Sequence, residues 1–351
     1  MSESERTRNA IIRTLIVDDS AFARKVVREM LLRSPFIEVV GMARDGEEAL
    51  KMASTLKPDV ITCDLTMPSM SGVEFVRQQM ARAPVPILIL SASPADGDQV
   101  LDAMNAGAVD FVRKPSARST DDLLSVRAEL TEKVKGAARA PVTSFRIEAP
   151  KQSARVAAPR HLKVDVVMLG ISTGGPQALR YLVPQLPADF PVPLLIVLHM
   201  PPGYTALFAT KLAEVSKLKV REAQDGDMLE AGTAIIAQAG RHLVLRRNHS
   251  GQTRMCLSTT PTDKLHRPSV DVLFQSGSEI YKERALAIVM TGMGDDGKEG
   301  AAWVKAQGGR VITEAEESCV IYGMPRCVVE AGLSDLSAPL AAMAETIMQN
   351  L

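Results

Sequence analysis

The chain has 351 residues, of which 46% are apolar and 23% are charged, and this length suggests roughly two domains. Its 41 basic and 41 acidic side chains give a formal net charge of +0, which excludes a global attraction to nucleic acid or anionic membranes. The N-terminus, MSESERTRNA, lacks the apolar segment of a signal peptide, and no apolar run approaches the ~20 residues that span a bilayer. We therefore expect a cytoplasmic protein with no nucleic-acid partner and no direct membrane insertion.

Short apolar runs alternate with helical segments over residues 11–135. The expected strands are TLIVDD, IEVVGM, DVITCD, PILILS and AVDFV. Segments such as 21–32 and 46–54 lie between them and have helical periodicity. This alternation predicts an α/β domain with a doubly wound parallel sheet and five βα units.

Residues 137–163 differ from both flanking regions. Ala, Pro and Ser dominate this segment, and it has no apolar periodicity. Such a composition predicts a flexible linker between two domains.

A second alternating block covers residues 164–350. Its expected strands are VDVVML, PLLIVL, AIIAQ, HLVLR, RMCLS, ALAIVM and RVITEA. The helices are expected at 176–185, 204–216, 268–282 and 298–307, and Gly308 and Gly309 end the last of these. We predict a second doubly wound, mostly parallel sheet with an antiparallel excursion where the strands at 233–257 follow one another closely.

Three acids end strands in the first half. Asp18 and Asp19 follow the first expected strand, and Asp64 ends the third. The carboxyl ends of parallel strands share one edge, so these carboxylates should converge there. Clustered carboxylates repel one another unless a cation lies among them, and hard oxygen ligands suit Mg²⁺. Helix capping is the alternative role for any one of them.

Two further groups belong to the same edge. Ser91 ends the fourth strand and Lys114 follows the fifth, and a hydroxyl with an ammonium suits a tetrahedral anion beside a metal. The five residues together resemble the receiver domain of two-component response regulators, which has a flavodoxin-like fold. The resemblance implies that Asp64 is the phosphoacceptor.

The same resemblance implies roles for the other four groups. Asp18 and Asp19 would bind Mg²⁺ together with Asp64, Ser91 would be the switch hydroxyl, and Lys114 would contact the phosphoryl group. A sensor histidine kinase would be the phosphodonor. The segment LTMPSMSG departs from the pattern at Ser71, where such domains often carry Asp, but that position is not a ligand.

The stretch LGISTGGPQ opens the second block. Gly170 to Gly174 match G-x-S-x-G between an expected strand and an expected helix, which would expose the hydroxyl of Ser172. A simple glycine-rich turn or an anion site at a helix N-terminus would give the same pattern. The segment lacks the lysine of a P-loop.

A serine nucleophile needs a base, and the chain has five histidines. His199 ends an apolar strand, LLIVLH, one βα unit after Ser172, so both should lie at the same sheet edge. His266, in the loop KLHRPSVD, is the second candidate.

The histidine in turn needs an orienting acid. TGMGDDG offers Asp295 and Asp296 after the strand that ends near Met290, and spacing cannot choose between them. Capping of the helix that begins near Gly297 would use at least one of the two. The order Ser, His, Asp differs from that of α/β-hydrolases, which is Ser, Asp, His.

Five motifs occur in this block in a specific order: GISTGGP, LHMPPGY, HRPSVDVLF, TGMGDDG and SCVIYGMPR. They resemble the catalytic domain of the chemotaxis protein-glutamate methylesterases. The resemblance implies Ser172 as nucleophile, His199 as base and Asp296 as the orienting acid. It places backbone groups near Thr173 and Met293 at the oxyanion site, and it implies no cofactor for ester hydrolysis.

The resemblance also implies a function. The enzyme would hydrolyse glutamyl methyl esters on the cytoplasmic domains of chemoreceptors, release methanol and deamidate certain glutamines. We expect the receiver to restrain the catalytic domain until Asp64 is phosphorylated. A transcriptional regulator would need a helix-turn-helix, which the second block does not suggest, and a docking module without catalysis would not need Ser172, His199 and Asp296 together.

Overall fold

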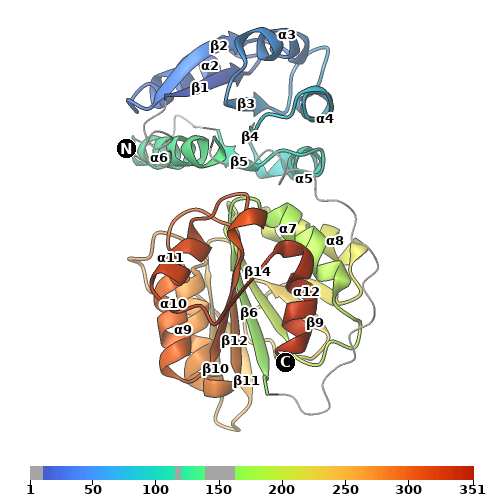
Figure 1. Cartoon of the computed structure of the whole chain (residues 1–351), viewed down its shortest axis with the longest axis vertical. Helices are drawn as coiled ribbons and strands as arrows, with labels where there is room; N and C mark the ends of the chain where they lie inside the picture. The colour runs from blue at the N-terminus through green and yellow to red at the C-terminus, as the bar shows by residue number, and fades with distance from the viewer. Residues whose placement is uncertain (1–10, 115–119, 139–162) are drawn as a thin grey trace. The chain divides into compact units, whose positions relative to one another are not determined.

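A computed structural model covers the chain and describes residues 11–114, 120–138 and 163–351. The chain divides into two compact units at a boundary within the undescribed segment 139–162, so nearly all of the predicted linker lies outside the described residues. Each unit is described by itself (Figure 1).

The first unit contains a parallel five-stranded sheet in the order β2-β1-β3-β4-β5. Its strands are β1 (Ile12–Val17), β2 (Ile37–Ala43), β3 (Val60–Asp64), β4 (Ile87–Ser91) and β5 (Asp110–Arg113). Its helices are α2 (Ala21–Leu31), α3 (Gly46–Leu56), α4 (Gly72–Arg82), α5 (Gly97–Asn105) and α6 (Thr120–Ala137), with a 3-10 turn η1 (Pro94–Asp96). The prediction of a flavodoxin-like domain with five βα units is confirmed.

Helices cover both faces of this sheet. Helices α2 and α6 pack together on one face, and α3, α4 and α5 lie on the other (Figure 1). Every residue of the central strands β3 and β4 is therefore buried. The strand order reverses between β1 and β3, which is where doubly wound sheets form their sites.

The second unit contains a seven-stranded parallel sheet and a separate antiparallel pair. The sheet order is β14-β13-β12-β6-β7-β9-β8, and β10 pairs with β11. The strands are β6 (Val166–Ile171), β7 (Leu194–Leu198), β8 (Lys219–Glu222), β9 (Thr233–Ile236), β10 (His242–Arg247), β11 (Thr253–Ser258), β12 (Ala285–Val289), β13 (Arg310–Glu314) and β14 (Leu336–Ala338). The predicted mostly parallel architecture is confirmed.

Six helices are described in the second unit. They are α7 (Gly175–Leu182), α8 (Thr205–Val215), α9 (Val270–Tyr281), α10 (Lys298–Ala306), α11 (Met324–Glu330) and α12 (Leu340–Gln349), with 3-10 turns η3 (Val183–Gln185), η4 (Lys282–Arg284) and η5 (Glu316–Ser318). Helices α9, α10 and α11 cover one face of the sheet, and α7, α8 and α12 cover the other (Figure 1).

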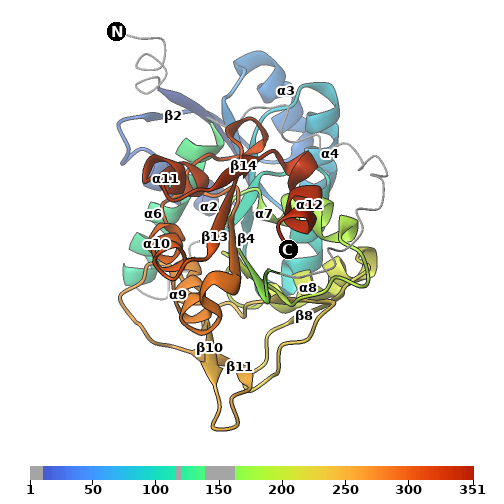
Figure 2. The ribbon, with the colours of Figure 1, turned by 60° about the horizontal axis from the view of Figure 1, so that its bottom comes forward.

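The strands differ from the expectation in three details, and the helices α11 and α12 were not predicted either. The antiparallel excursion is confined to the β10–β11 hairpin (Figure 2), whereas β9 joins the main sheet in parallel with β7 and β8. Strands β8 and β14 were not predicted. Both are short strands at the edges of the sheet, with sequences KVRE and LSA that present no apolar run.

The sequence predicts no segment that spans a bilayer. Within the described ranges, no helix combines the length and the apolar character needed to cross a bilayer.

Candidate active site

The turn that carries Ser172 follows directly from β6. The Gly175 N–H donates to the Ser172 carbonyl at 2.7 Å, and Gly174 takes the left-handed conformation with φ of 80°. A side chain at Gly174 would be strained there and would also place Cβ 2.6 Å from Val320. The chain thus bends within three residues, and α7 begins at Gly175.

His199 lies beside this turn because β6 and β7 are parallel neighbours. Ile171 pairs with Leu198, and the His199 N–H donates to the Ile171 carbonyl at 3.1 Å. Ser172 and His199 are therefore the residues that follow two paired strand ends. The His199 side chain is 8% exposed.

Asp296 lies in the loop after β12 and accepts four hydrogen bonds. His199 Nε2 lies 2.8 Å from Asp296 Oδ2. The other three donors belong to the start of α9: the Ser269 hydroxyl at 2.8 Å, the Val270 N–H at 2.8 Å and the Asp271 N–H at 3.0 Å. The carboxylate thus caps the N-terminus of α9 while it holds the histidine ring.

These contacts determine the charge of Asp296. Burial alone would raise its pKa, but the bond and charge of His199 and the N–H donors of α9 lower the pKa well below its ordinary value. Asp296 is therefore ionised at neutral pH. Asp295 is exposed, and its carbonyl accepts the Lys298 N–H.

The expectation that Asp295 or Asp296 caps the following helix is wrong. Neither side chain caps α10, whose N-terminal N–H groups are bound by Asp271 from α9. Asp271 Oδ1 accepts the Gly297 N–H at 2.9 Å and the Gly300 N–H at 2.8 Å. Asp296 thus caps α9, which contains Asp271, and Asp271 caps α10, which follows Asp296, so the two helix starts are joined by reciprocal hydrogen bonds.

His199 has one ring nitrogen left after its bond to Asp296. Its Nδ1 is buried and makes no hydrogen bond to any described residue. A negatively charged hydrogen-bond acceptor beside Nε2 favours the tautomer with hydrogen on Nε2, which leaves a lone pair on Nδ1. His266 stacks on the ring with centroids 4.1 Å apart and planes at 19°. His266 therefore packs on the ring of His199 and takes no part in the hydrogen bond between His199 and Asp296.

His242 is a residue whose role the sequence did not reveal. It is fully buried, accepts the Ser269 N–H on Nδ1 at 3.2 Å and donates from Nε2 to the Pro261 carbonyl at 2.9 Å. Burial lowers its pKa, which keeps the ring neutral, as this pair of bonds requires. His242 therefore holds both ends of the loop that carries His266.

Of the predicted oxyanion groups, Thr173 lies in the same turn as Ser172 and Met293 lies in the loop after β12. A Cβ built on Gly292 would lie 2.8 Å from Ser172 Cβ, so only glycine lets the segment before Met293 approach the serine. The Thr173 carbonyl accepts the Thr291 hydroxyl at 3.0 Å. The oxyanion role of the Thr173 and Met293 N–H groups stays a prediction.

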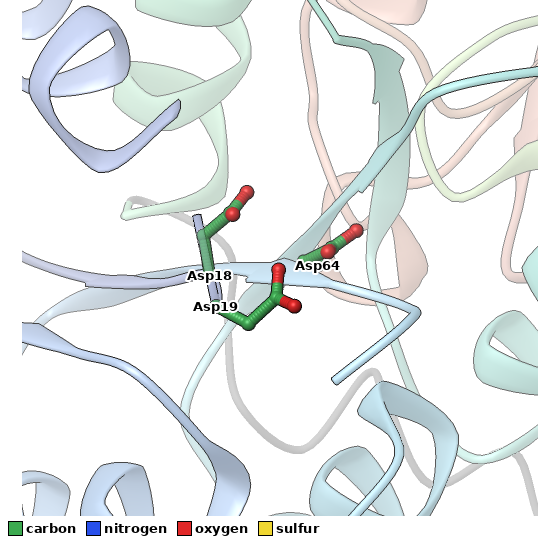
Figure 3. A group of neighbouring side chains, drawn as sticks. All are labelled: Asp18, Asp19 and Asp64. Atoms are coloured by element: carbon green, nitrogen blue, oxygen red, sulfur yellow. The ribbon is translucent and has the colours of Figure 1, made fainter. Parts of the chain in front are cut away.

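The first unit brings its three acids together at the predicted edge. Oxygen atoms of Asp18, Asp19 and Asp64 all lie within 4.8 Å of one another, and Figure 3 shows the three side chains at the ends of β1 and β3. Lys114 Nζ lies 2.7 Å from Asp18 Oδ2 and 2.9 Å from Asp64 Oδ1. Asp19 is the exposed member of the group.

The cluster holds more negative charge than Lys114 offsets. Burial raises the pKa of Asp64, and Asp18 adds to this, although Lys114 and the Leu65 N–H act in the opposite direction. Three carboxylates with a single cation among them fit a hard divalent ion such as Mg²⁺. The residues present therefore suit the metal that receiver domains use.

The two remaining positions of this edge are also described. The Ser91 hydroxyl is directed to the Ser93 carbonyl at 3.1 Å and to Asp96 Oδ2 at 3.2 Å, and the Ser91 carbonyl accepts the Lys114 N–H. Ser71, which replaces the frequent Asp, caps α4 by accepting the Glu74 N–H at 3.2 Å. It has a structural role there.

Two family models match the chain. The CheB methylesterase model matches residues 167–347, and the response regulator receiver domain model matches residues 14–125. Among solved structures, the crystal structure of the Thermotoga maritima CheB methylesterase catalytic domain is similar, with a TM-score of 0.52, 39% identity and coverage of 54% of this chain and 100% of that one.

Two relatives match this chain over nearly its whole length. A protein-glutamate methylesterase/protein-glutamine glutaminase 5 of Myxococcus xanthus is 45% identical over 95% of this chain and 96% of its own length. The protein-glutamate methylesterase/protein-glutamine glutaminase of Halalkalibacterium halodurans is 42% identical over 96% of this chain and 98% of its own. The chain therefore belongs to the CheB methylesterase family, a family of hydrolases, and carries a response regulator receiver domain.

Proposed function

We propose that this chain hydrolyses glutamyl methyl esters on chemoreceptor proteins, with release of methanol, and that phosphorylation of Asp64 raises this activity. One observation carries the proposal. His199 binds the ionised Asp296 through Nε2, its buried Nδ1 has no partner among the described residues, and its backbone follows the strand end that pairs with the one before Ser172. A base held in this way is suited to taking the proton of a serine hydroxyl.

The reaction is an acyl transfer. Nδ1 of His199 removes the proton of Ser172, whose Oγ attacks the ester carbonyl, and the negative oxygen is stabilised by N–H groups near Thr173 and Met293. The protonated His199 then donates that proton to the departing methoxide, which leaves as methanol. Water hydrolyses the glutamyl-enzyme in a second cycle with His199 as base, which restores Ser172. Asp296 stabilises the imidazolium in both cycles.

Deamidation of glutamine follows the same path with ammonia as the leaving group. The relatives from Myxococcus xanthus and Halalkalibacterium halodurans are named for both activities, which supports both for this chain.

The receiver supplies the control. We assign it to residues 11–135, joined by a linker at 137–163 to a catalytic domain at 164–350. Asp18, Asp19 and Asp64 would hold Mg²⁺, and the bound ion would supply positive charge for the phosphoryl oxygens. Asp64 accepts that group from a sensor histidine kinase, Lys114 contacts its oxygens, and Ser91 is the switch hydroxyl. The substrate is on the cytoplasmic domains of receptors, so we expect a cytoplasmic enzyme.

The test is methanol release from a carboxyl-methylated receptor fragment, with and without a small-molecule phosphodonor and Mg²⁺. Ser172→Ala should lower kcat by roughly 10⁴- to 10⁶-fold. Asp64→Ala should remove the increase caused by the phosphodonor. Release that persists in Ser172→Ala would contradict the assignment of the nucleophile, and a folded protein without any release would indicate a docking role.

A further inference from the structure

Glu314 is a buried acid that the reaction described above does not use. It is the last residue of β13 and is 0% exposed. It forms no ion pair with a basic side chain in the described parts of the chain. Burying a carboxyl group costs free energy unless hydrogen bonds satisfy it, so the hydrogen bonds of Glu314 show what it is positioned to do.

Two donors from different loops bind this carboxyl group. The Thr291 N–H donates to Oε2 at 2.8 Å, and the Ser318 hydroxyl donates to Oε1 at 2.9 Å. Ser318 also accepts the Leu340 N–H at 2.9 Å, which fixes the position of its hydroxyl. Glu314 therefore connects the loop after β12 to the turn η5.

Thr291 links Glu314 to the turn that carries Ser172. It is 1% exposed, and its carbonyl accepts the Ser172 N–H at 3.0 Å. Its hydroxyl donates to the Thr173 carbonyl at 3.0 Å and accepts the Ile321 N–H at 3.0 Å. Thr291 thus holds the backbone on both sides of the Ser172 side chain, and Glu314 holds Thr291.

We propose that Glu314 is a positioning residue for Ser172, acting through Thr291. The inference rests on the proposed esterase function. Loss of the acceptor would leave the Thr291 N–H buried and unpaired, and the loop would shift to satisfy it. A displacement of about 1 Å of a reacting group can cost roughly 10²-fold in rate, whereas substrate binding elsewhere is unaffected.

The acceptor matters here more than the negative charge. Burial raises the pKa of Glu314 to about 7, although hydrogen bonds from Thr291, Ser318 and Cys319 lower it, so a neutral carboxyl group is accessible in the native state. A glutamine keeps an oxygen for the Thr291 N–H and turns its amide toward Ser318. The Ser318 hydroxyl can then donate to the Ala315 carbonyl, which lies 3.2 Å away.

The experiment compares Glu314→Ala with Glu314→Gln in the full-length enzyme. A matched control is Glu317→Gln, an exposed acid three residues further along. Methanol release from the methylated receptor fragment gives kcat and KM, and Ser172→Ala is measured in parallel. Urea unfolding followed by fluorescence of Trp303, the chain's 1 tryptophan, reports whether the catalytic unit is folded.

We expect Glu314→Ala to lower kcat by roughly 10- to 100-fold with KM within about twofold of wild type. Glu314→Gln and Glu317→Gln should stay within about threefold in both constants. Thr291→Val removes only the hydroxyl contacts and should lower kcat in the same way. Its effect should be less than additive with Glu314→Ala, because both act through one connection.

Several results would overturn the proposal. Wild-type kcat in a folded Glu314→Ala enzyme would do so, and so would equal losses in the alanine and glutamine variants or a change confined to KM. If Glu314→Ala does not fold, wild-type kcat in a folded Thr291→Val enzyme is decisive against it. Turnover that survives Ser172→Ala would instead refute the proposed function itself.

Discussion

The two carboxylates of the candidate sites, Asp64 in the first unit and Asp296 in the second, have pKa values shifted in opposite directions. Asp64 lies in a group of three acids with one lysine, and its pKa is raised by burial and by Asp18. Asp296 is equally buried in its loop, but four donors converge on it and its pKa is lowered. The first site therefore has more negative than positive charge, which suits a metal and a phosphoryl group, whereas the second holds a stable anion.

The difference teaches what each carboxylate is built to do. A phosphoacceptor must react, so the negative charge around it is only partly offset by positive charge until a metal and a phosphoryl group bind. An orienting acid must never react, so helix N–H groups and a hydroxyl saturate its oxygens. Four experiments would break or sharpen this contrast.

The largest expected effect is that of Asp296→Asn. The asparagine amide has no negative charge, and its NH₂ can donate to His199 Nε2. The ring then no longer favours the tautomer with hydrogen on Nε2, which leaves Nδ1 free for Ser172. We expect kcat for methanol release to fall by roughly 10⁴-fold. Asp295→Asn, at the exposed neighbouring acid, is the control and should stay within about twofold. Equal activity of the two variants would show that the charge on Asp296 is not used.

The counterpart in the receiver is Asp64→Asn. An amide is not a nucleophile toward phosphorus, so labelling of the chain by a radioactive small-molecule phosphodonor with Mg²⁺ should fall to background. The ratio of esterase activities with and without phosphodonor should fall to about 1. Asp102→Asn, at an exposed position on α5, should label like wild type. Persistent label in Asp64→Asn would place the acceptor elsewhere.

A third buried acid, Glu314, offers an intermediate case whose effect is on stability. Its pKa is about 7 in the folded chain against 4.5 as its ordinary value, so the folded state binds the proton more tightly. The free energy of unfolding should therefore fall as pH rises from 4.5 to about 7, by at most about 3 kcal/mol, and level off above that.

Urea unfolding monitored at Trp303 would measure this slope. Glu314→Gln does not titrate, so its stability should vary less between about pH 5 and about pH 8 than that of wild type. Identical slopes in the two proteins would show that Glu314 does not hold a proton preferentially in the folded state.

The smallest effect concerns the exposed member of the metal group. Asp19→Asn removes one of three carboxylates, and an exposed ligand is already partly solvated, so we expect Mg²⁺ to bind roughly tenfold more weakly. Calorimetric titration is the suitable measurement, because Trp303 lies in the other unit. Asp102→Asn again serves as the control. Unchanged affinity in Asp19→Asn would remove Asp19 from the metal site.

Sequence reasoning reached these residues because both sheets are parallel. Asp18, Asp64, Ser172 and His199 all follow apolar runs, and the carboxyl ends of such strands must share an edge. Their placement is therefore a consequence of local pattern and one topological rule. The same reasoning missed β8 and β14, since edge strands can be short and polar, and it assigned β9 to the antiparallel excursion because chain proximity suggested a hairpin.

Contacts between loops could not be predicted in this way. His199 and Asp296 are 97 residues apart, Asp296 binds the start of a helix 26 residues earlier, and Glu314 binds Thr291 across 23 residues. The choice between Asp295 and Asp296, the capping of α10 by Asp271 and the buried role of His242 all depend on which donors these loops bring within hydrogen-bond distance.

The amino-acid sequence by itself determined two α/β domains, their order, and the strand ends at which acid, base and nucleophile occur, because periodicity and chain direction are local properties. Only the tertiary structure decided which atoms satisfy one another. Hydrogen bonds need partners within about 3 Å, and that proximity arises only when distant loops pack over the same sheet edge.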